Sequence, residues 1–310
     1  IDSGATLTAS AANSNVFGNW YNNNGTFSHS NGTVTFNHPF SFTQNITSVS
    51  GVAGFYNLVV AQNVTLQGNT NLTVDGNLDL NLNVLNLGGN TLTLNGTTTF
   101  TTGFLDGGNT TAALQIGGGP GDVGTVNLGN QTSFATLTMN RSGKIYFTGD
   151  PLIINNSVQF NNGYVFSNSN PVLFNAGASH NGANDSSFIA TKVAKAGNTD
   201  FTFPVGDTNK YRPLLVSNIS AFDTIITSYH NNDPNSDGYY ANQIVPPIHH
   251  INRSEYWKVG LDPQSAGTIN ANIILSWDAI SCGVDNLSDL VVSRFINGAG
   301  NWQNAGNTQT

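Results

Sequence analysis

The chain has 310 residues, of which only 8% are charged, and its formal net charge is −8 at pH 7. All nine Lys and Arg lie from Arg141 onward, so the first 140 residues cannot neutralise phosphates. This distribution excludes nucleic-acid binding and disfavours anionic membranes. A single cysteine, Cys282, excludes an internal disulfide framework. No run approaches 18 apolar residues, so no membrane insertion is expected.

Alternation of apolar and polar residues predicts short strands along the N-terminal part of the chain. The clearest examples are residues 32–36, 57–60, 63–66, 71–80 and 91–94. Turn dipeptides such as Gly-Asn, Asn-Gly and Asp-Gly separate them. In the last of these strands, Leu92 and Leu94 should face a core, and Thr91 and Thr93 should face solvent.

Two segments, residues 55–96 and 134–177, repeat one order of features. Each begins with Phe-x-x-Leu, continues with short alternating strands, and ends in Asn-Gly or Asn-Ala-Gly. Strands return after roughly 20 residues, which is typical of one coil of a solenoid. We therefore predict an all-β protein with a right-handed parallel β-helix over residues 1–186.

Composition changes after residue 186, where most of the basic residues, Pro and Tyr occur. Short strands are predicted at 201–207, 211–216, 222–230, 255–261, 272–278 and 290–295. This spacing is typical of an antiparallel sandwich, so residues 187–310 are predicted to form an immunoglobulin-like domain with Trp257 and Trp277 in its core.

Several stretches together resemble one protein family. They are GNWYNNNGTF (18–27), GTVTF (32–36), SGVAGFYNLVV (50–60), GNTLTLNG (89–96), TDFTFPVGD with YRPL (199–214), and EYWKV, LSWDAISCGV, LSDLVVSRF and WQNAGN beyond residue 254. The family comprises large Bacteroidetes cell-surface proteins that pair β-helical repeats with a β-sandwich and look like exports of the type IX secretion system. The resemblance covers most of the chain. It implies an extracellular structural or adhesive role, and it brings no catalytic residues.

In members of that family, a sequence similar to residues 302–310 is usually followed by another strand and often by a C-terminal sorting domain. By that comparison, this chain either is cut or processed here, or its sandwich lacks the last strand and exposes an edge.

One loop resembles the start of a calcium-binding loop. In DPNSDG (233–238), oxygen ligands would come from Asp233, Asn235 and Asp237, with Gly238 at the sixth position. Ile244 stands where such a loop needs Glu, so a solvated loop is the alternative. No other cofactor is predicted. Adjacent His249 and His250 would point to opposite faces of a strand, which makes a shared metal awkward.

Catalysis is not expected. Glycoside hydrolysis generally needs two carboxylates about 5–10 Å apart. The one glutamate, Glu255, lies in an apolar pattern and is predicted to pair with a nearby Arg or Lys. Arg212 is predicted either to form an ion pair with nearby Asp207 or to brace backbone carbonyls. Asp75 and Asp79 are predicted to be isolated corner residues. Ice binding would need the same Thr-x-Thr pattern on one face of successive coils. The Thr-rich run at 91–103 is not repeated at its predicted equivalent, 171–174.

We therefore expect an extracellular structural protein of the cell surface that self-assembles into fibres or a layer through strand edges. The strand donated to a neighbour would be Ala5, Thr6, Leu7, Thr8, Ala9 and Ser10. The alternative is a monomeric adhesin that binds glycans or other cells through aromatics such as Trp20, Tyr21, Tyr239, Tyr240 and Trp302. A polysaccharide-acting enzyme and an ice-binding protein are less favoured.

Overall fold

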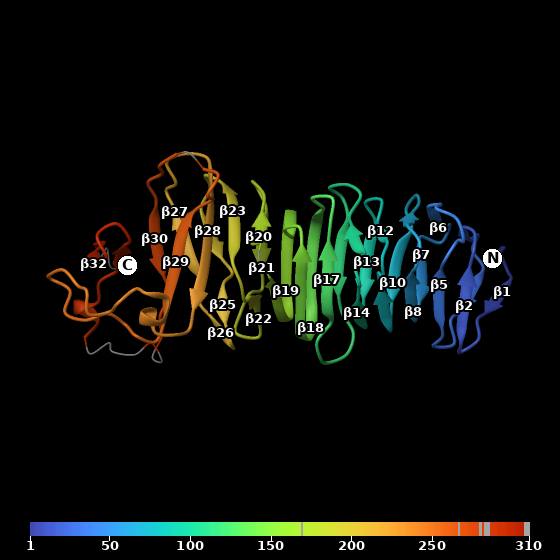
Figure 1. The fold of residues 1–310 in the computed structure, drawn as a ribbon, viewed down its shortest axis with the longest axis horizontal. Coiled ribbons are helices and arrows are strands. Elements are labelled where there is room, and N and C mark those ends of the chain that lie inside the picture. Colours follow the sequence, from blue (N-terminus) through green and yellow to red (C-terminus); the bar gives the residue numbers. More distant parts are fainter. Residues whose placement is uncertain (169, 266, 279–280, 282–285, 307–310) are drawn as a thin grey trace.

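The structure is a computed structural model that describes residues 1–168, 170–265, 267–278, 281 and 286–306. Figure 1 shows an elongated molecule whose short strands run across its long axis, with the N-terminal coils at one end. Within the described residues there is no α-helix, and the helical segments are two short 3-10 helices, η1 (Pro234–Asp237) and η2 (Leu287–Asp289). No helix in this part of the chain is long and apolar enough to cross a bilayer.

Three ladders of parallel strands form a β-solenoid of about nine turns. The first ladder contains β7 (Val52–Phe55), β10 (Asn71–Val74), β13 (Thr91–Leu94), β16 (Ala113–Ile116), parts of β18 (Ser133–Gly149) and β19 (Ile153–Ser167), and β21 (Ser179–Asn181). The second contains β2 (Asn13–Val16), β5 (Thr33–Phe36), β8 (Asn57–Val60), β11 (Asn77–Asp79), β14 (Thr97–Thr99), β17 (Gly124–Leu128), later parts of β18 and β19, and β22 (Ser187–Ile189).

The third ladder contains β3 (Trp20–Asn22), β6 (Gln44–Ser48), β9 (Val64–Leu66), β12 (Val84–Asn86), β15 (Phe104–Asp106) and the end of β17. At the N-terminal end, β1 (Thr6–Thr8) pairs in parallel with β4 (Thr26–Ser28). Near the other end of the solenoid, β20 (Val172–Phe174) pairs with β19 and with β23 (Val193–Gly197).

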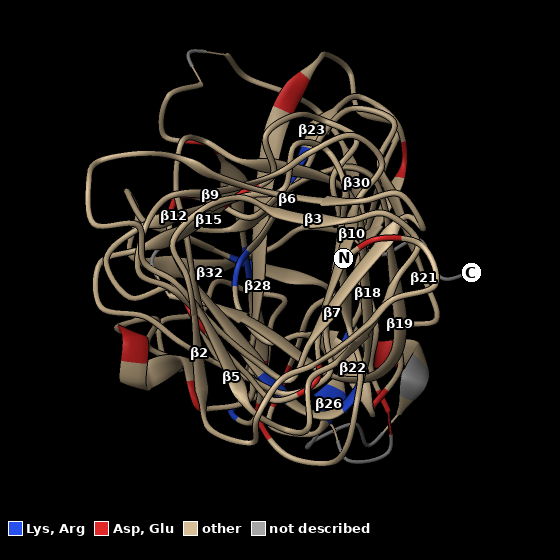
Figure 2. Cartoon of the chain, turned by 90° about the vertical axis from the view of Figure 1, so that its right-hand side faces the viewer, with Lys and Arg blue, Asp and Glu red and all other residues tan. Residues whose placement is uncertain are grey.

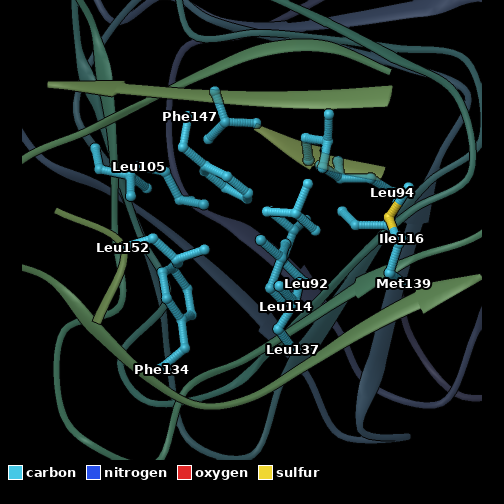
Figure 3. Close-up of a cluster of buried hydrophobic side chains, with 14 of the residues drawn as sticks. Leu92, Leu94, Leu105, Leu114, Ile116, Phe134, Leu137, Met139, Phe147 and Leu152 are labelled. Atoms are coloured by element: carbon cyan, nitrogen blue, oxygen red, sulfur yellow. The ribbon is translucent and has the colours of Figure 1, made fainter. Parts of the chain in front are cut away.

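Alternation along each strand explains how the coils stack. Leu92 pairs with Leu72 on one side and with Leu114 on the other, each roughly 20 residues away, as predicted for one coil. Its side chain is fully buried, while Thr91 and Thr93 lie half-buried on the outer surface. Figure 3 shows the resulting columns of buried side chains, including Leu92, Leu114 and Leu137, and Leu94, Ile116 and Met139. The predicted parallel β-helix, with leucines inside and threonines outside, is confirmed.

The two repeated segments do not occupy matching positions in their coils. Phe55 pairs with Val74 in the first ladder, whereas Phe134 pairs with Ile154 at the start of β18, before the part of that strand that joins the first ladder. Both phenylalanines are fully buried. The two segments therefore resemble each other because every coil needs buried residues at its strands and corners. They begin at different points of the coil.

One charged side chain braces the solenoid from inside. Arg141 is 7% exposed, and its Nε donates to the Gly121 carbonyl oxygen at 2.6 Å. Its Nη1 donates to the carbonyl oxygens of Asn95 at 2.8 Å and Gly96 at 2.7 Å. These carbonyls lie at corners of earlier coils, so the guanidinium satisfies backbone groups that have no ladder partner at a turn.

Antiparallel pairing begins where the solenoid ends. β23 pairs in parallel with β20 and antiparallel with β28 (Asp223–His230), which pairs with β29 (Tyr256–Leu261). A second antiparallel sheet contains β24 (Phe201–Phe203), β27 (Leu214–Ser217) and β30 (Asn272–Leu275). Two hairpins complete the fold, β25 (Gly206–Asp207) with β26 (Lys210–Tyr211), and β31 (Ser293–Ile296) with β32 (Asn301–Asn304).

This arrangement joins the two predicted domains without a gap. The solenoid's parallel pairing includes β22 and β23, so it extends beyond the predicted boundary at residue 186. Phe203, Val216 and Ile225 from the antiparallel strands belong to the same buried cluster as the leucines of the solenoid. The core of the rod therefore continues between β28 and the β24–β27–β30 sheet.

Candidate functional surfaces

A buried ionic network lies between the two antiparallel sheets. Arg212 donates through Nε to Glu255 Oε2 at 3.0 Å and through Nη2 to Asp278 Oδ2 at 2.6 Å. Tyr229 donates its hydroxyl to the same Glu255 oxygen at 2.6 Å, and Ser281 donates to Oε1. Both carboxylate oxygens of Glu255 therefore accept hydrogen bonds, and Glu255 is only 5% exposed.

The bonds of this network brace the two antiparallel sheets against each other. Burial, and then the hydrogen bond to Glu255, raise the pKa of Tyr229 far above its usual value, so this hydroxyl stays a donor. The prediction that Glu255 pairs with a basic residue is confirmed. The predicted ion pair between Arg212 and Asp207 was wrong, because Arg212 bonds Glu255 and Asp278, while Asp207 accepts a 3.4 Å bond from the backbone N–H of Asn231. The alternative, a brace to backbone carbonyls, is met in part, because Arg212 Nη1 donates to the Tyr211 carbonyl at 3.2 Å.

The two tryptophans of the predicted sandwich core differ. Trp257 packs against the core cluster and donates its indole N–H to the Arg212 carbonyl at 3.1 Å. Trp277 is 47% exposed, so placing it in the core was wrong. It follows the edge strand β30, where the sheet ends and no further strand pairs among the described residues. Cys282 lies outside the described residues.

The candidate calcium loop directs its carboxylates to neighbouring cations. Asp233 Oδ2 accepts from Arg253 at 2.6 and 2.8 Å, and Asp233 Oδ1 accepts from the Asn235 N–H at 2.9 Å. Asp237 Oδ2 accepts from Lys258 Nζ at 2.8 Å and from the hydroxyl of Tyr256. The hydrogen bonds to these basic side chains are the main reason that the pKa of each aspartate is lowered.

The third candidate ligand, Asn235, uses its side-chain oxygen to accept from the Ala241 N–H at 2.6 Å. A calcium ion at this loop would have to displace both cations and this backbone contact. The loop is therefore explained without a metal, as a cap on η1 and a brace to β29. Among the residues that the structure describes, no group of three or more His, Cys, Asp or Glu side chains is placed to hold a metal ion.

The remaining acidic and histidine candidates are separate from one another. Asp75 directly follows β10 of the first ladder and accepts from Asn95 at 2.8 Å. Asp79 lies in β11 of the second ladder and accepts from the Asn81 N–H at 2.8 Å. His249 and His250 are both exposed. None of these positions forms a pair of facing carboxylates.

The segment predicted as a donated strand is paired within its own chain. Its central residues form β1, which makes three residue pairs with β4, and the Ala9 N–H bonds the Ser28 carbonyl at 2.8 Å. All three residues of β1 are exposed, including Leu7 at 45%. Donation to a neighbour would therefore require release of this short pairing.

Edge strands of the antiparallel region expose apolar side chains. β30 pairs with β27 on one side, and no described strand pairs with its other side. Ile273 and Ile274 of this strand are 40% and 48% exposed, and Val259 on the edge strand β29 is 40% exposed. Figure 2, viewed from the N-terminal end, shows how few charged residues the chain carries.

Aromatic residues give little support to a flat sugar-binding platform. Trp20 packs edge-on against Phe27 at 4.8 Å, Tyr239 packs against Phe295 at 5.2 Å, and Trp302 is buried. Tyr21 and Tyr240 are the exposed members of the predicted set. An open depression of about 390 Å³ does lie at the junction of the solenoid and the antiparallel strands, lined by residues 179–183, 200–202 and 211.

The register also shows which threonines share a surface. Thr91 and Thr93 pair with Asn71 and Thr73 on one side and with Ala113 and Gln115 on the other. Thr-x-Thr is therefore not repeated in the adjacent coils. The predicted equivalent at 171–174 lies elsewhere, because β20 pairs with β19 and β23.

No protein-family model matches this chain, and no match was found among curated proteins or solved structures. The resemblance to Bacteroidetes surface proteins stays a prediction.

Sequence reasoning missed two polar residues that the structure makes prominent, the buried Arg141 and the half-buried His180. Arg141 lies within β18, and from the sequence alone it resembles an ordinary surface residue, because its carbonyl partners are remote in sequence. His180 occupies a core column of the first ladder, opposite Val158. Its position could have been found by counting one coil onward from Val158, since every preceding member of that column back to Leu72 is aliphatic.

Proposed function

We propose that this protein is an extracellular structural element of the cell surface, in which the solenoid is a stiff rod and the C-terminal strand edges make contacts between copies. The observation that carries the proposal is the pair of edge strands β29 and β30 with exposed Val259, Ile273 and Ile274. An edge of this kind has backbone donors and acceptors that another strand can satisfy, and apolar side chains that the added strand would cover.

The solenoid favours a mechanical role over a chemical one. Its ladders are continuous, its interior is filled by aliphatic and aromatic side chains, and its outer side chains bond from coil to coil, as in Asn77 to Thr99 at 3.1 Å and Asn175 to Asn155 at 2.6 Å. Its outer surface has few charges to orient a substrate. A surface-displayed location agrees with the low charge content and with the resemblance to Bacteroidetes exports.

We include in this proposal that residues 187–310 form an immunoglobulin-like sandwich and that the solenoid is right-handed. The strands at 201–203, 214–217, 223–230, 256–261 and 272–275 support the former, because they form two antiparallel sheets around one core. In a sandwich of this kind, an unpaired edge beside β30 is where a donated strand would lie. Residues 5–10 of another copy are the proposed donor.

Negative-stain microscopy with light scattering tests the proposal on the full chain and on a chain without residues 1–12. Fibres or sheets that disappear on truncation support strand donation. Assemblies that persist after truncation but are lost in Ile274→Lys support contacts at the β30 edge with another donor. Leu82→Lys, at a residue that is 59% exposed on the solenoid, is the matched control and should assemble normally. A monomer of about the chain mass, 32.7 kDa, at all concentrations would contradict self-assembly.

A monomeric adhesin is the second candidate, and the depression at the junction favours it. Tyr211, Asp200 and Asn181 supply an aromatic ring, a carboxylate and an amide around one opening, which is the combination that sugar hydroxyls and ring faces bind. Glycan arrays with the wild type and Tyr211→Ala test this function. Binding by a monomer that is lost in Tyr211→Ala would support the adhesin.

A further inference from the structure

A histidine occupies a position that belongs to the apolar core at the last coil of the first ladder. His180 lies in β21 and pairs with Val158, which continues the column of Leu137 and Leu114. Three phenylalanines surround the imidazole with their rings at steep angles to it. Ring centroids are 6.0 Å away for Phe160, 6.2 Å for Phe174 and 5.5 Å for Phe201.

The same ring connects two sheets. β21 belongs to the solenoid, whereas β24 belongs to the β24–β27–β30 sheet, and the two strands are not paired with each other. His180 Nε2 lies 2.5 Å from the carbonyl oxygen of Thr202 in β24. A carbonyl oxygen can only accept, so Nε2 must carry the proton and donate it. The imidazole therefore adds a side-chain bond at this junction, beside the backbone bond from the Ile189 N–H to the Pro204 carbonyl at 2.9 Å.

The second ring nitrogen has no partner. Nδ1 is buried and makes no hydrogen bond within the described part of the chain. In the neutral tautomer that donates through Nε2, Nδ1 is an unprotonated acceptor, and its burial has a modest cost. Protonation would turn Nδ1 into a second donor on a charged ring, and an unpaired buried charge costs far more.

We propose that His180 is a pH-sensitive latch between the solenoid and the β24–β27–β30 sheet: the neutral imidazole closes the junction, and protonation in mildly acidic solution opens it. Opening would expose Phe201 and its ring neighbours and loosen the β24–β27–β30 sheet from the last coil, while β23 would still pair with β20 and with β28.

Charged and titratable groups around the latch do not compensate an imidazolium. Lys195 of β23 lies with Nζ 5.4 Å from the centre of the Phe201 ring and donates to the Asn175 carbonyl, so the nearby cation would repel a charged ring. Asp200, before β24, accepts from the Asn218 N–H at 3.0 Å. Tyr211 stays neutral because burial raises its pKa. No described carboxylate forms an ion pair with His180.

The direction of the pH effect follows from which state binds the proton more tightly. Burial lowers the pKa of His180, and the bond to Thr202 offsets this only in part. The open junction has an ordinary imidazole with a pKa near 6.5. Closure is therefore fully stable above about pH 6.5 and weakens as the pH falls below that value. At pH 5.5 the open population should be larger than at neutral pH, by at most about tenfold, which is the limit set by the ordinary pKa of the open state.

Hydrogen–deuterium exchange on the full chain tests the latch at pH 7.5 and 5.5, after correction for intrinsic exchange. Peptides covering residues 172–203 should exchange faster at pH 5.5, by at most about tenfold, while peptides covering 85–116 should not change. His180→Gln keeps an N–H that can donate to Thr202 and does not titrate, so its junction peptides should be insensitive to pH. His249→Gln, at an exposed position, should behave as the wild type.

A local readout is needed because burial also lowers the pKa of His230, which lies outside these peptides. Equal acceleration in the wild type and in His180→Gln would overturn the proposal, as would no acceleration in the wild type. If His180→Gln does not fold, the imidazole can be titrated by NMR in the wild type. A midpoint well below 6.5 supports the latch, and a midpoint at or above 6.5 refutes it.

Discussion

The guanidinium of Arg141 reaches back 46 residues to donate to the carbonyl oxygen of Asn95, at a distance of 2.8 Å. The same side chain bonds the carbonyls of Gly96 and Gly121, so one residue holds the corners of successive coils together. The backbone ladders set the spacing between coils, while this contact fixes the corners, where the ladders are interrupted.

Replacing Arg141 by Met should lower the free energy of unfolding by about 2–4 kcal/mol, because buried carbonyl oxygens lose their donors while the apolar volume is kept. Urea unfolding followed by circular dichroism measures the change. Arg294→Met, at an exposed residue, is the control and should change stability by less than about 0.5 kcal/mol. Equal stability of the two variants would show that the corner bonds are dispensable.

Leu114 tests the core columns. It is fully buried between Leu92 and Leu137, so Leu114→Ala should leave a cavity and cost about 2–5 kcal/mol. The outward-facing Thr93→Ala, one coil earlier in the same ladder, should cost less than about 0.5 kcal/mol. Thermal unfolding of both variants would check the contrast, and a comparable loss in each would mean that the faces are assigned incorrectly.

Gly96 tests how closely the coils approach at a corner. A Cβ at this position would lie 1.4 Å from the Gly76 carbonyl oxygen, so the backbone itself would have to move. Gly96→Ala should therefore cost at least about 2 kcal/mol. Gly119→Ala is the comparison, since no atom lies within 4 Å of its added Cβ. Similar melting temperatures for the two variants would contradict the close packing at residue 96.

Calcium provides a test of the loop at 233–238. Because Arg253 and Lys258 hold its carboxylates, millimolar calcium should shift the melting temperature of the wild type by less than about 1 °C. A double substitution, Arg253→Ser with Lys258→Ser, removes both cations and would reveal any latent affinity as a calcium-dependent rise. A rise of several degrees in the wild type would restore the calcium site that DPNSDG predicts.

Period-two alternation was enough to locate strands such as 57–60 and 91–94, and it identified Leu92 and Leu94 as core residues. These features are local, since each side chain's face depends only on its place in its own strand. The return of strands after about 20 residues also identified the solenoid, because every coil must bury its inner face against the next.

Tertiary structure decided what depends on contact between remote residues. Arg212 bonds Glu255 and Asp278, which follow it by 43 and 66 residues, and no local pattern favours them over the nearer Asp207. The same holds for the exposure of Trp277, for the different phases of Phe55 and Phe134, and for His180 in a core column. The sequence by itself determined where strands form and which face of each strand is apolar, because both depend only on residues that are neighbours in the chain. Register, charge partners and free edges were decided only when the coils stacked, because each is a relation between segments that sequence distance does not constrain.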